Sequence, residues 1–133
     1  VLPYLEYTGD KNIDVNLEVI LIPENGDENL VSTSNYKYMY WTMEQQLAHH
    51  TVNGCNINVG DMMASGTISG PTKQEYGSFL ELTWKGTQPI TLKDGTERKF
   101  VNDNDTIVLK GYCKKDNVRI GFGECRAKLL PAI

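Results

Sequence analysis

The chain has 133 residues, with 17 Asp and Glu against 13 Lys and Arg, which gives a net charge of −4 at pH 7. This length fits one domain that can bury a sizeable core. The acidic balance and the absence of a Lys/Arg stripe argue against nucleic acid or an anionic membrane as a partner. No apolar run approaches the roughly 18 residues of a membrane span, and three widely spaced cysteines indicate a reduced, cytoplasmic protein.

The first predicted element is a strand over residues 13–22. Its apolar residues alternate, so that one face carries Val15, Leu17, Val19 and Leu21. A polar, acidic turn is expected over residues 23–29.

A long helix is predicted from Tyr36 to Val52, with Ser34 as the candidate cap and Asn53-Gly54 as the end. At 100° per residue, two opposite apolar stripes result: one holds Tyr36, Met39, Tyr40, Met43, Leu47 and His50, the other Tyr38, Trp41, Ala48 and Val52. A surface helix normally shows one such stripe. We therefore expect this helix to be covered on both sides, by the sheet of this chain and by a second body.

The next segment, MMASGT over residues 62–67, predicts a strand that runs into Gly66, Gly70 and Pro71. A glycine beside a threonine at a strand end lets a ligand approach the backbone closely. Gly66 and Thr67 are therefore candidate binding residues. The pattern by itself supports a purely structural bulge equally well.

The remainder reads as a β-meander. Strands are predicted over residues 78–84, 88–92, 97–101, 106–113 and 118–125, with a hairpin turn at Asp94-Gly95. With neither internal repeat nor linker, residues 1–133 predict one compact α+β unit that is mainly β and has one long helix.

Glu81 is the sharpest anomaly, because it stands inside the apolar predicted strand over residues 78–84. The pattern favours a carboxylate on the solvated face of an antiparallel strand. The alternative is a carboxylate that points into a cleft, where its surroundings tune its pKa.

Other reactive side chains suggest no site. Adjacent helical residues point about 100° apart, so His49 and His50 cannot converge on one metal ion. We expect His50 on the core stripe and His49 on its flank. Cys55, Cys113 and Cys125 are interpreted as small buried apolar groups, and the reducing compartment argues against a Cys113–Cys125 disulfide.

Three segments resemble the fumarylacetoacetate hydrolase family: SNYKYMYWTMEQQLAHHTVNGCN (residues 34–56), GDMMASGTISG (60–70) and FGECRAKLLPAI (122–133). The resemblance covers essentially the whole chain. The first segment is specific to the enzyme that gives the family its name, whereas the Gly-Thr motif indicates only the superfamily.

The resemblance implies that the chain is the C-terminal portion of a catalytic domain with a mixed β-sandwich or roll. The implied activity of the intact enzyme is metal-dependent hydrolysis of the carbon–carbon bond of 4-fumarylacetoacetate, a β-diketo acid, to fumarate and acetoacetate in tyrosine and phenylalanine catabolism. Glu81 would orient a catalytic His that lies outside this chain, while Gly66 and Thr67 would bind substrate. The ligands of one Mg²⁺ or Ca²⁺ would also lie outside it, and the intact protein would be a homodimer.

Two alternatives remain open from the sequence. One is another activity of the superfamily, an acylpyruvate hydrolase or an oxaloacetate decarboxylase. The other is that the chain, as isolated, is a non-catalytic β-rich module.

Overall fold

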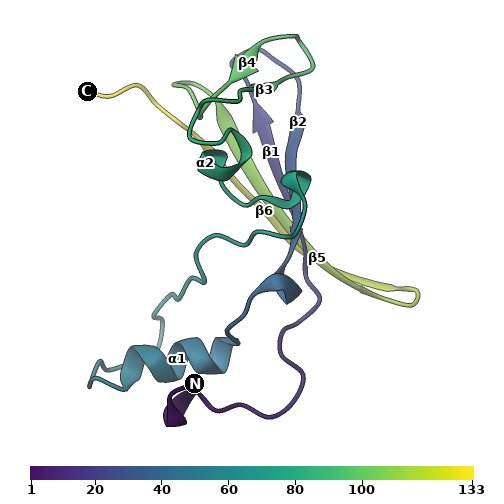
Figure 1. Ribbon diagram of the computed structural model, residues 1–133. Helices are drawn as coiled ribbons and strands as arrows, with labels where there is room; N and C mark the ends of the chain where they lie inside the picture. The colour runs from purple at the N-terminus through teal and green to yellow at the C-terminus, as the bar shows by residue number, and fades with distance from the viewer.

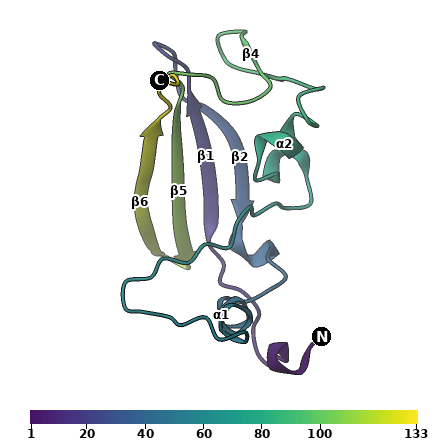
Figure 2. The same cartoon turned by 90° about the vertical axis from the view of Figure 1, so that its left-hand side faces the viewer.

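The computed structural model describes residues Val1–Ile133 and centres on a four-stranded antiparallel sheet with the strand order β2-β1-β5-β6 (Figure 2). The strands are β1 (Asn16–Ile22), β2 (Asn29–Asn35), β5 (Thr106–Lys115) and β6 (Val118–Lys128). The strands predicted over residues 13–22, 106–113 and 118–125 are therefore confirmed.

The core lies where the two central strands pair. Ile20 of β1 is opposite Val108 of β5, and both side chains are buried. Leu21, the next residue of β1, is also fully buried, so both faces of this strand are covered here. All residues of β6, the edge strand beside β5, are exposed. The buried residues of the sheet thus lie on β1, β2 and β5, and none lies on β6.

One helix, α1 (Met43–Thr51), lies beyond one end of the sheet together with the short 3-10 helices η1 (Pro3–Leu5) and η2 (Tyr36–Tyr38) (Figures 1 and 2). The side chain of Gln45 is buried and donates through Nε2 to the carbonyl oxygen of Leu5, at 2.6 Å. This bond joins α1 to the N-terminal segment.

The predicted helix from Tyr36 is wrong at its start and right at its end. The residues before Tyr36 belong to β2, and Asn35 Oδ1 accepts the backbone N–H of Lys37 to begin η2. The α-helix starts only where Thr42 and Gln45 form a reciprocal capping box. It ends at Thr51, and Gly54 then adopts a φ of +91°, as expected of a glycine after a helix.

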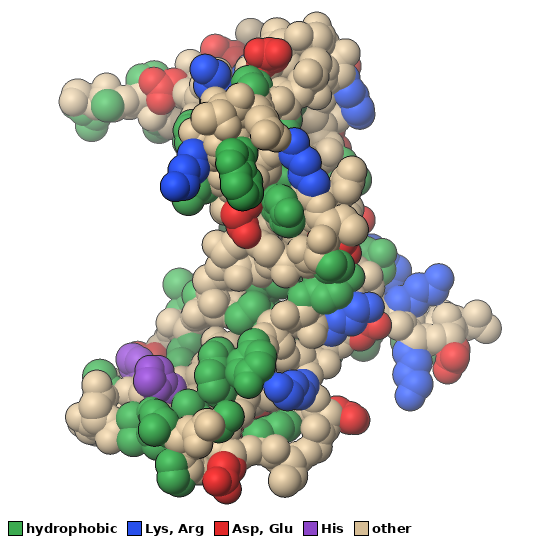
Figure 3. Space-filling view, viewed as in Figure 1, with side chains coloured by type: hydrophobic (Ala, Val, Ile, Leu, Met, Phe, Trp, Pro, Cys, Tyr) green, Lys and Arg blue, Asp and Glu red, His purple; other side chains and the backbone are tan.

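The prediction of two apolar stripes on one long helix is consequently wrong, because its residues are divided between η2 and α1. Met43 and Leu47 belong to α1 but are 52% and 41% exposed, and His50 is exposed as well. Hydrophobic side chains gather on the outside of this part of the molecule (Figure 3). The face that α1 buries is instead marked by the polar Gln45.

The connection from α1 to β5 contains the short elements η3 (Lys73–Glu75), α2 (Phe79–Leu82), β3 (Ile90–Thr91) and β4 (Glu97–Arg98). β3 and β4 form the predicted hairpin around Asp94-Gly95, with Gly95 at a φ of +83°. The strand predicted over residues 62–67 is wrong, since this segment has no regular secondary structure. The strand predicted over residues 78–84 is wrong too, because α2 occupies its centre.

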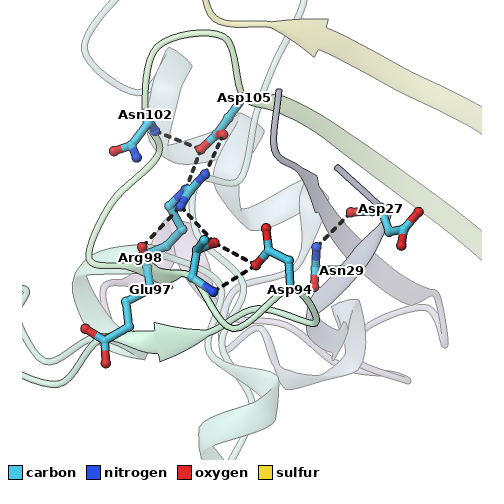
Figure 4. Close-up of polar contacts among 8 residues, drawn as sticks. Asp27, Asn29, Asp94, Glu97, Arg98, Asn102 and Asp105 are labelled. Atoms are coloured by element: carbon cyan, nitrogen blue, oxygen red, sulfur yellow. Dashed lines mark hydrogen bonds and ion pairs between the residues drawn. The ribbon is translucent and has the colours of Figure 1, made fainter. Parts of the chain in front are cut away.

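A buried ion pair joins the hairpin to the start of β5 (Figure 4). Arg98 donates through Nε to Asp105 Oδ2 at 3.0 Å and through Nη2 to Oδ1 at 3.1 Å. Asp105 Oδ2 also accepts the backbone N–H of Asn102 at 2.9 Å. The Asp105 carboxylate therefore anchors both ends of the loop between β4 and β5.

With 29% of residues in strands and 17% in helices, the α+β, mainly β class is confirmed. The longest α-helix, α1, has nine residues and is therefore shorter than the helix predicted from Tyr36 to Val52. No helix combines the length and the apolar character that a membrane crossing requires.

Candidate functional site

Glu81 lies on α2 and is positioned by the cap of that helix. The backbone N–H of Glu81 donates to Ser78 Oγ at 3.3 Å, and the Ser78 hydroxyl donates to Glu81 Oε2 at 2.8 Å. Ser78 and Glu81 thus follow the S-x-x-E pattern of a helix N-terminus. The same pattern explains why the segment is helical despite its apolar, strand-like composition.

A second serine reaches Glu81 from another segment. Ser69 Oγ lies 2.9 Å from both carboxylate oxygens of Glu81. The same Ser69 oxygen accepts the backbone N–H of Gly77 at 3.0 Å. The Glu81 carboxylate is therefore held by two hydroxyl groups, one from its own helix and one from outside it.

The predicted pair Gly66 and Thr67 lies on the segment that leads to Ser69. Gly66 has a φ of +78°, a conformation that suits glycine. A Cβ atom added at Gly77 would lie 2.5 Å from the carbonyl oxygen of Ile68 and 2.9 Å from Cγ2 of Thr67. The structure thus brings the Thr67 segment against the residues that precede α2, on the side from which Ser69 contacts Glu81.

The charge of Glu81 has no cationic partner within the chain. The side chain is half-buried, and none of the ion pairs in the structure includes it. A carboxylate that loses part of its hydration normally recovers hydrogen bonds or a counter-charge. Here the two serines supply neutral donors only, so a positively charged or N–H donor from outside the chain has an acceptor available.

The loop between Ser69 and Gly77 is tethered to the sheet. Ser32 of β2 donates through Oγ to the carbonyl oxygen of Tyr76 at 2.7 Å. Tyr38 donates through its hydroxyl to Glu75 Oε1, also at 2.7 Å. Hydrogen bonds from Thr72 and then from Tyr38 lower the pKa of Glu75 below its ordinary value. The carboxylate form of Glu75, which accepts these hydrogen bonds, is therefore favoured.

The turn after α2 is sharply bent. Trp84, Lys85 and Gly86 have φ values of +48°, +58° and +79°, so three consecutive residues are left-handed. For the two residues with side chains this conformation costs energy. The backbone N–H of Lys85 donates to the carbonyl oxygen of Leu80 at 2.8 Å, which closes the end of α2. Helix α2 is thus fixed at both of its ends around Glu81.

An apolar hollow of about 500 Å³ lies on the α1 side of the site. Met43 and Leu47 line it, with Met63 and Ser65 from the segment before Gly66. Glu81 and Thr67 do not belong to its lining. Along the chain, the Gly66–Thr67 segment joins Ser65 of this hollow to Ser69, which contacts Glu81.

The histidines and cysteines do not form a site. His49 stacks on Tyr4, with ring centroids 6.2 Å apart, and its Nδ1 lies 3.0 Å from the Tyr4 hydroxyl oxygen. The expected core position of His50 is wrong, since that side chain is exposed. The structure has no group of three or more His, Cys, Asp or Glu residues placed to hold a metal ion.

The expected burial of the cysteines is wrong for Cys55 and Cys125, which are exposed, while Cys113 is half-buried. Cys113 is opposite Ile120 in the β5–β6 register, whereas Cys125 is opposite Leu109. At about 3.4 Å per residue, four strand positions separate the two cysteines by roughly 14 Å. This distance is too long for a disulfide.

Sequence reasoning missed Ser69 and Ser78 as the partners of Glu81. For Ser78 the signal was present, because serine three residues before glutamate marks a helix start. For Ser69 no local signal exists, since it lies 12 residues from Glu81 and the contact depends on the loop between them.

Comparisons with known proteins agree on one family. The family model described as "Fumarylacetoacetate (FAA) hydrolase C-terminal" matches residues 4–130. The chain is 53% identical to the fumarylacetoacetase of Homo sapiens in a 133-position alignment that covers 99% of this chain and 32% of the relative. It is 52% identical to the fumarylacetoacetases of Dictyostelium discoideum and Caenorhabditis elegans, over 98% and 97% of this chain and 31% of each relative.

The chain thus spans about a third of the length of the curated relatives that it matches, and it corresponds to their C-terminal third. The family model covers nearly all of the chain, including the segments that carry Gly66, Thr67 and Glu81. This chain therefore belongs to the fumarylacetoacetate hydrolase family.

Proposed function

We propose that the protein containing this chain hydrolyses 4-fumarylacetoacetate at the carbon–carbon bond between the fumaroyl carbonyl carbon and the adjacent methylene carbon, giving fumarate and acetoacetate. The proposal rests on identities near 50% to fumarylacetoacetases along the whole chain. The observation that carries it is the half-buried Glu81 carboxylate, which two serines hold and no cation of the chain neutralises.

In this proposal Glu81 accepts the N–H of a histidine that lies outside the chain. A carboxylate in that position fixes the imidazole tautomer and stabilises the imidazolium that forms when the histidine takes a proton from water. The water oxygen then attacks a carbonyl carbon, the carbon–carbon bond breaks with its electron pair on the leaving carbon, and this carbanion takes up the proton that the histidine removed from the water. Glu81 remains an acceptor throughout and is not consumed.

Gly66 and Thr67 supply the substrate contacts of this chain. Thr67 is exposed, so its hydroxyl is free to donate to a carboxylate or carbonyl oxygen of the substrate. The left-handed backbone at Gly66 and its lack of a side chain allow close approach of a ligand.

The divalent ion that the resemblance implies does not fit the residues present here, because no acidic or histidine cluster in the chain could ligate it. Its ligands belong to the proposal only as residues outside this chain, and no step assigned to Glu81 or Thr67 passes through it. A homodimeric state and a cytoplasmic location are likewise parts of the proposal that rest on the resemblance and on cysteine usage.

The substitution Glu81→Gln in the intact enzyme tests the proposal. Glutamine keeps the size of the side chain and can still accept from Ser69, but it lacks the charge that stabilises an imidazolium. We expect kcat for 4-fumarylacetoacetate to fall at least about 100-fold, the usual scale for losing an acid–base partner. Glu97→Gln is the matched control, since Glu97 is exposed on β4, and it should leave kcat unchanged.

Near-normal kcat in Glu81→Gln would remove Glu81 from the mechanism. Parallel assays of the unsubstituted enzyme with acylpyruvates and oxaloacetate separate the superfamily activities. Turnover of either of these in preference to 4-fumarylacetoacetate would overturn the proposed substrate while leaving the family assignment intact.

A further inference from the structure

We infer that Ser69 is a positioning residue for the proposed reaction: it locks the Glu81 carboxylate and ties it to the Gly66–Thr67 segment. The inference rests on the proposed function, because it gives Ser69 a role only through Glu81. It adds a residue that neither the sequence motifs nor the comparisons assign.

The hydrogen-bond pattern gives the Ser69 hydroxyl one direction. A serine hydroxyl has one proton to donate and two lone pairs to accept. The backbone N–H of Gly77 occupies a lone pair of the Ser69 oxygen at 3.0 Å. The acceptors within reach of its proton are the two Glu81 oxygens, each at 2.9 Å. Ser69 therefore donates to Glu81 and accepts from Gly77.

Ser69 differs from Ser78 in where it comes from. Ser78 is the N-cap of α2, so it moves with the helix that carries Glu81. Ser69 lies outside the helix. Apart from the N-cap Ser78, it is the only residue whose side chain hydrogen-bonds to the Glu81 carboxylate. It is therefore Ser69 that fixes the carboxylate relative to the Thr67 segment.

Gly77 makes the contact sterically possible. A Cβ atom at Gly77 would lie 2.5 Å from the carbonyl oxygen of Ile68 and 2.9 Å from Thr67, closer than such atoms approach in proteins. The Ile68 carbonyl group and the Thr67 methyl group therefore pack directly on Gly77, with no room for a side chain between. Ser69 is thereby held at hydrogen-bonding distance from the helix that follows.

The arrangement leaves one part of the carboxylate available. A carboxylate offers about four lone-pair sites. Oε2 receives Ser78 and the shared Ser69 proton, whereas Oε1 receives only the shared proton. Oε1 thus retains capacity for an N–H donor while the two serines restrict rotation of the carboxylate. A preoriented acceptor of this kind lowers the cost of placing the base.

The decisive experiment is a double-mutant cycle in the intact enzyme with 4-fumarylacetoacetate as the substrate. Ser69→Ala should lower kcat roughly 10- to 100-fold, the scale seen when a supporting hydrogen bond or about 1 Å of alignment is lost. In a Glu81→Gln background the same Ser69→Ala change should alter kcat less than about twofold, because the group that it positions is gone. A merely structural serine would lower kcat by the same factor in both backgrounds.

Two further variants cover folding and steric effects. Ser69→Cys keeps nearly the same shape but is a weak donor, so a folded Ser69→Cys enzyme should lose activity as Ser69→Ala does. Ser34→Ala is the control, since the Ser34 hydroxyl is buried in β2 without a hydrogen-bond partner, and its kcat should be unchanged.

The outcomes separate this inference from the proposed function. If Glu81→Gln is impaired while Ser69→Ala and Ser69→Cys are fully active, the inference fails and the proposed function stands. Equal losses for Ser69→Ala in both backgrounds also overturn the inference. If Glu81→Gln itself is fully active, the role proposed for Glu81 fails and takes the role of Ser69 with it, whereas the proposed hydrolysis is overturned only by preferential turnover of acylpyruvates or oxaloacetate.

Discussion

The Arg98–Asp105 pair offers the sharpest test of how the chain is held together. Asp105 is almost fully buried, with 2% of its side chain exposed, and 12% of the Arg98 side chain is exposed. The hydrogen bonds to Asp105 raise the pKa of Arg98 further above its ordinary value, so the guanidinium remains charged at any pH of interest. Replacing Arg98 by Met keeps most of its apolar volume but leaves the Asp105 charge without a cation.

The expected cost follows from that burial. Removing one partner of a buried ion pair costs about 3–5 kcal/mol, because the remaining charge stays desolvated. Whole-domain stabilities are about 5–15 kcal/mol, so Arg98→Met should remove a large part of the folding free energy. At roughly 3–6 °C per kcal/mol for a domain of this size, the melting temperature should fall by about 10–30 °C.

Urea unfolding of the intact protein, followed by far-UV circular dichroism, measures this loss. The control is Arg126→Met, since Arg126 lies 3.5 Å from Glu28 and 3.2 Å from Glu124 with 45% of its side chain exposed. Exposed pairs contribute about 0–1 kcal/mol. If Arg98→Met lowers the free energy of unfolding no more than Arg126→Met does, burial of the charge does not explain the contribution of the Arg98–Asp105 pair to stability.

A second variant separates charge from packing. In Arg98→Met/Asp105→Asn the buried charge is gone, and the Asn side chain can still accept the backbone N–H of Asn102. We expect this double variant to be more stable than Arg98→Met alone. A double variant that is no more stable than Arg98→Met would show that the unpaired charge is not the main cause of the loss.

Two further predictions concern the loop between Ser69 and Gly77. Because the folded-state pKa of Glu75 is lowered, its stabilising effect is present above the ordinary pKa of 4.5 and is lost as the pH falls through the lowered value. Tyr38→Phe removes one of the donors, so a ¹³C carboxyl NMR titration should show the pKa of Glu75 moving up toward 4.5; an unchanged pKa would rule out the Tyr38 contribution. Gly70→Ala places a Cβ atom 2.7 Å from both Tyr38 and Glu75, which should cost about 1–3 kcal/mol in urea unfolding. Gly121→Ala on the open edge strand, where the nearest atom is 3.9 Å away, should stay within about 0.5 kcal/mol, and equal effects at both glycines would refute the packing argument.

The elements that were predicted correctly are those whose pattern repeats over many residues or whose turn is local. Alternation over β1 and the Asp94-Gly95 hairpin are examples, because strand burial and a two-residue turn leave a direct mark on nearby residues. The misplaced helix start and the wrong strand over residues 78–84 share one cause. Apolar periodicity outweighed the short capping patterns that begin at Thr42 and Ser78. Helix starts depend on a few hydrogen bonds, which a hydrophobic stripe does not encode.

For the candidate site, the sequence pattern singled out Gly66, Thr67 and Glu81 and the resemblance supplied their expected roles, whereas neither gave their arrangement. The interpretation of Glu81 as a strand residue was wrong, yet the side chain is half-buried and bonded to Ser69, two residues after Thr67. A motif identifies the positions of functional residues but does not fix their secondary structure, because either a helix or a strand can present the same side chain.

By itself the sequence determined the family, the mainly β class and the acidic character of this chain, because these depend on residue identities and on short-range patterns. Only the tertiary structure decided that Ser69 meets Glu81 and that Arg98 meets Asp105. Such contacts depend on how loops close, and loop closure reflects backbone packing at positions such as Gly77 that no periodic pattern reveals.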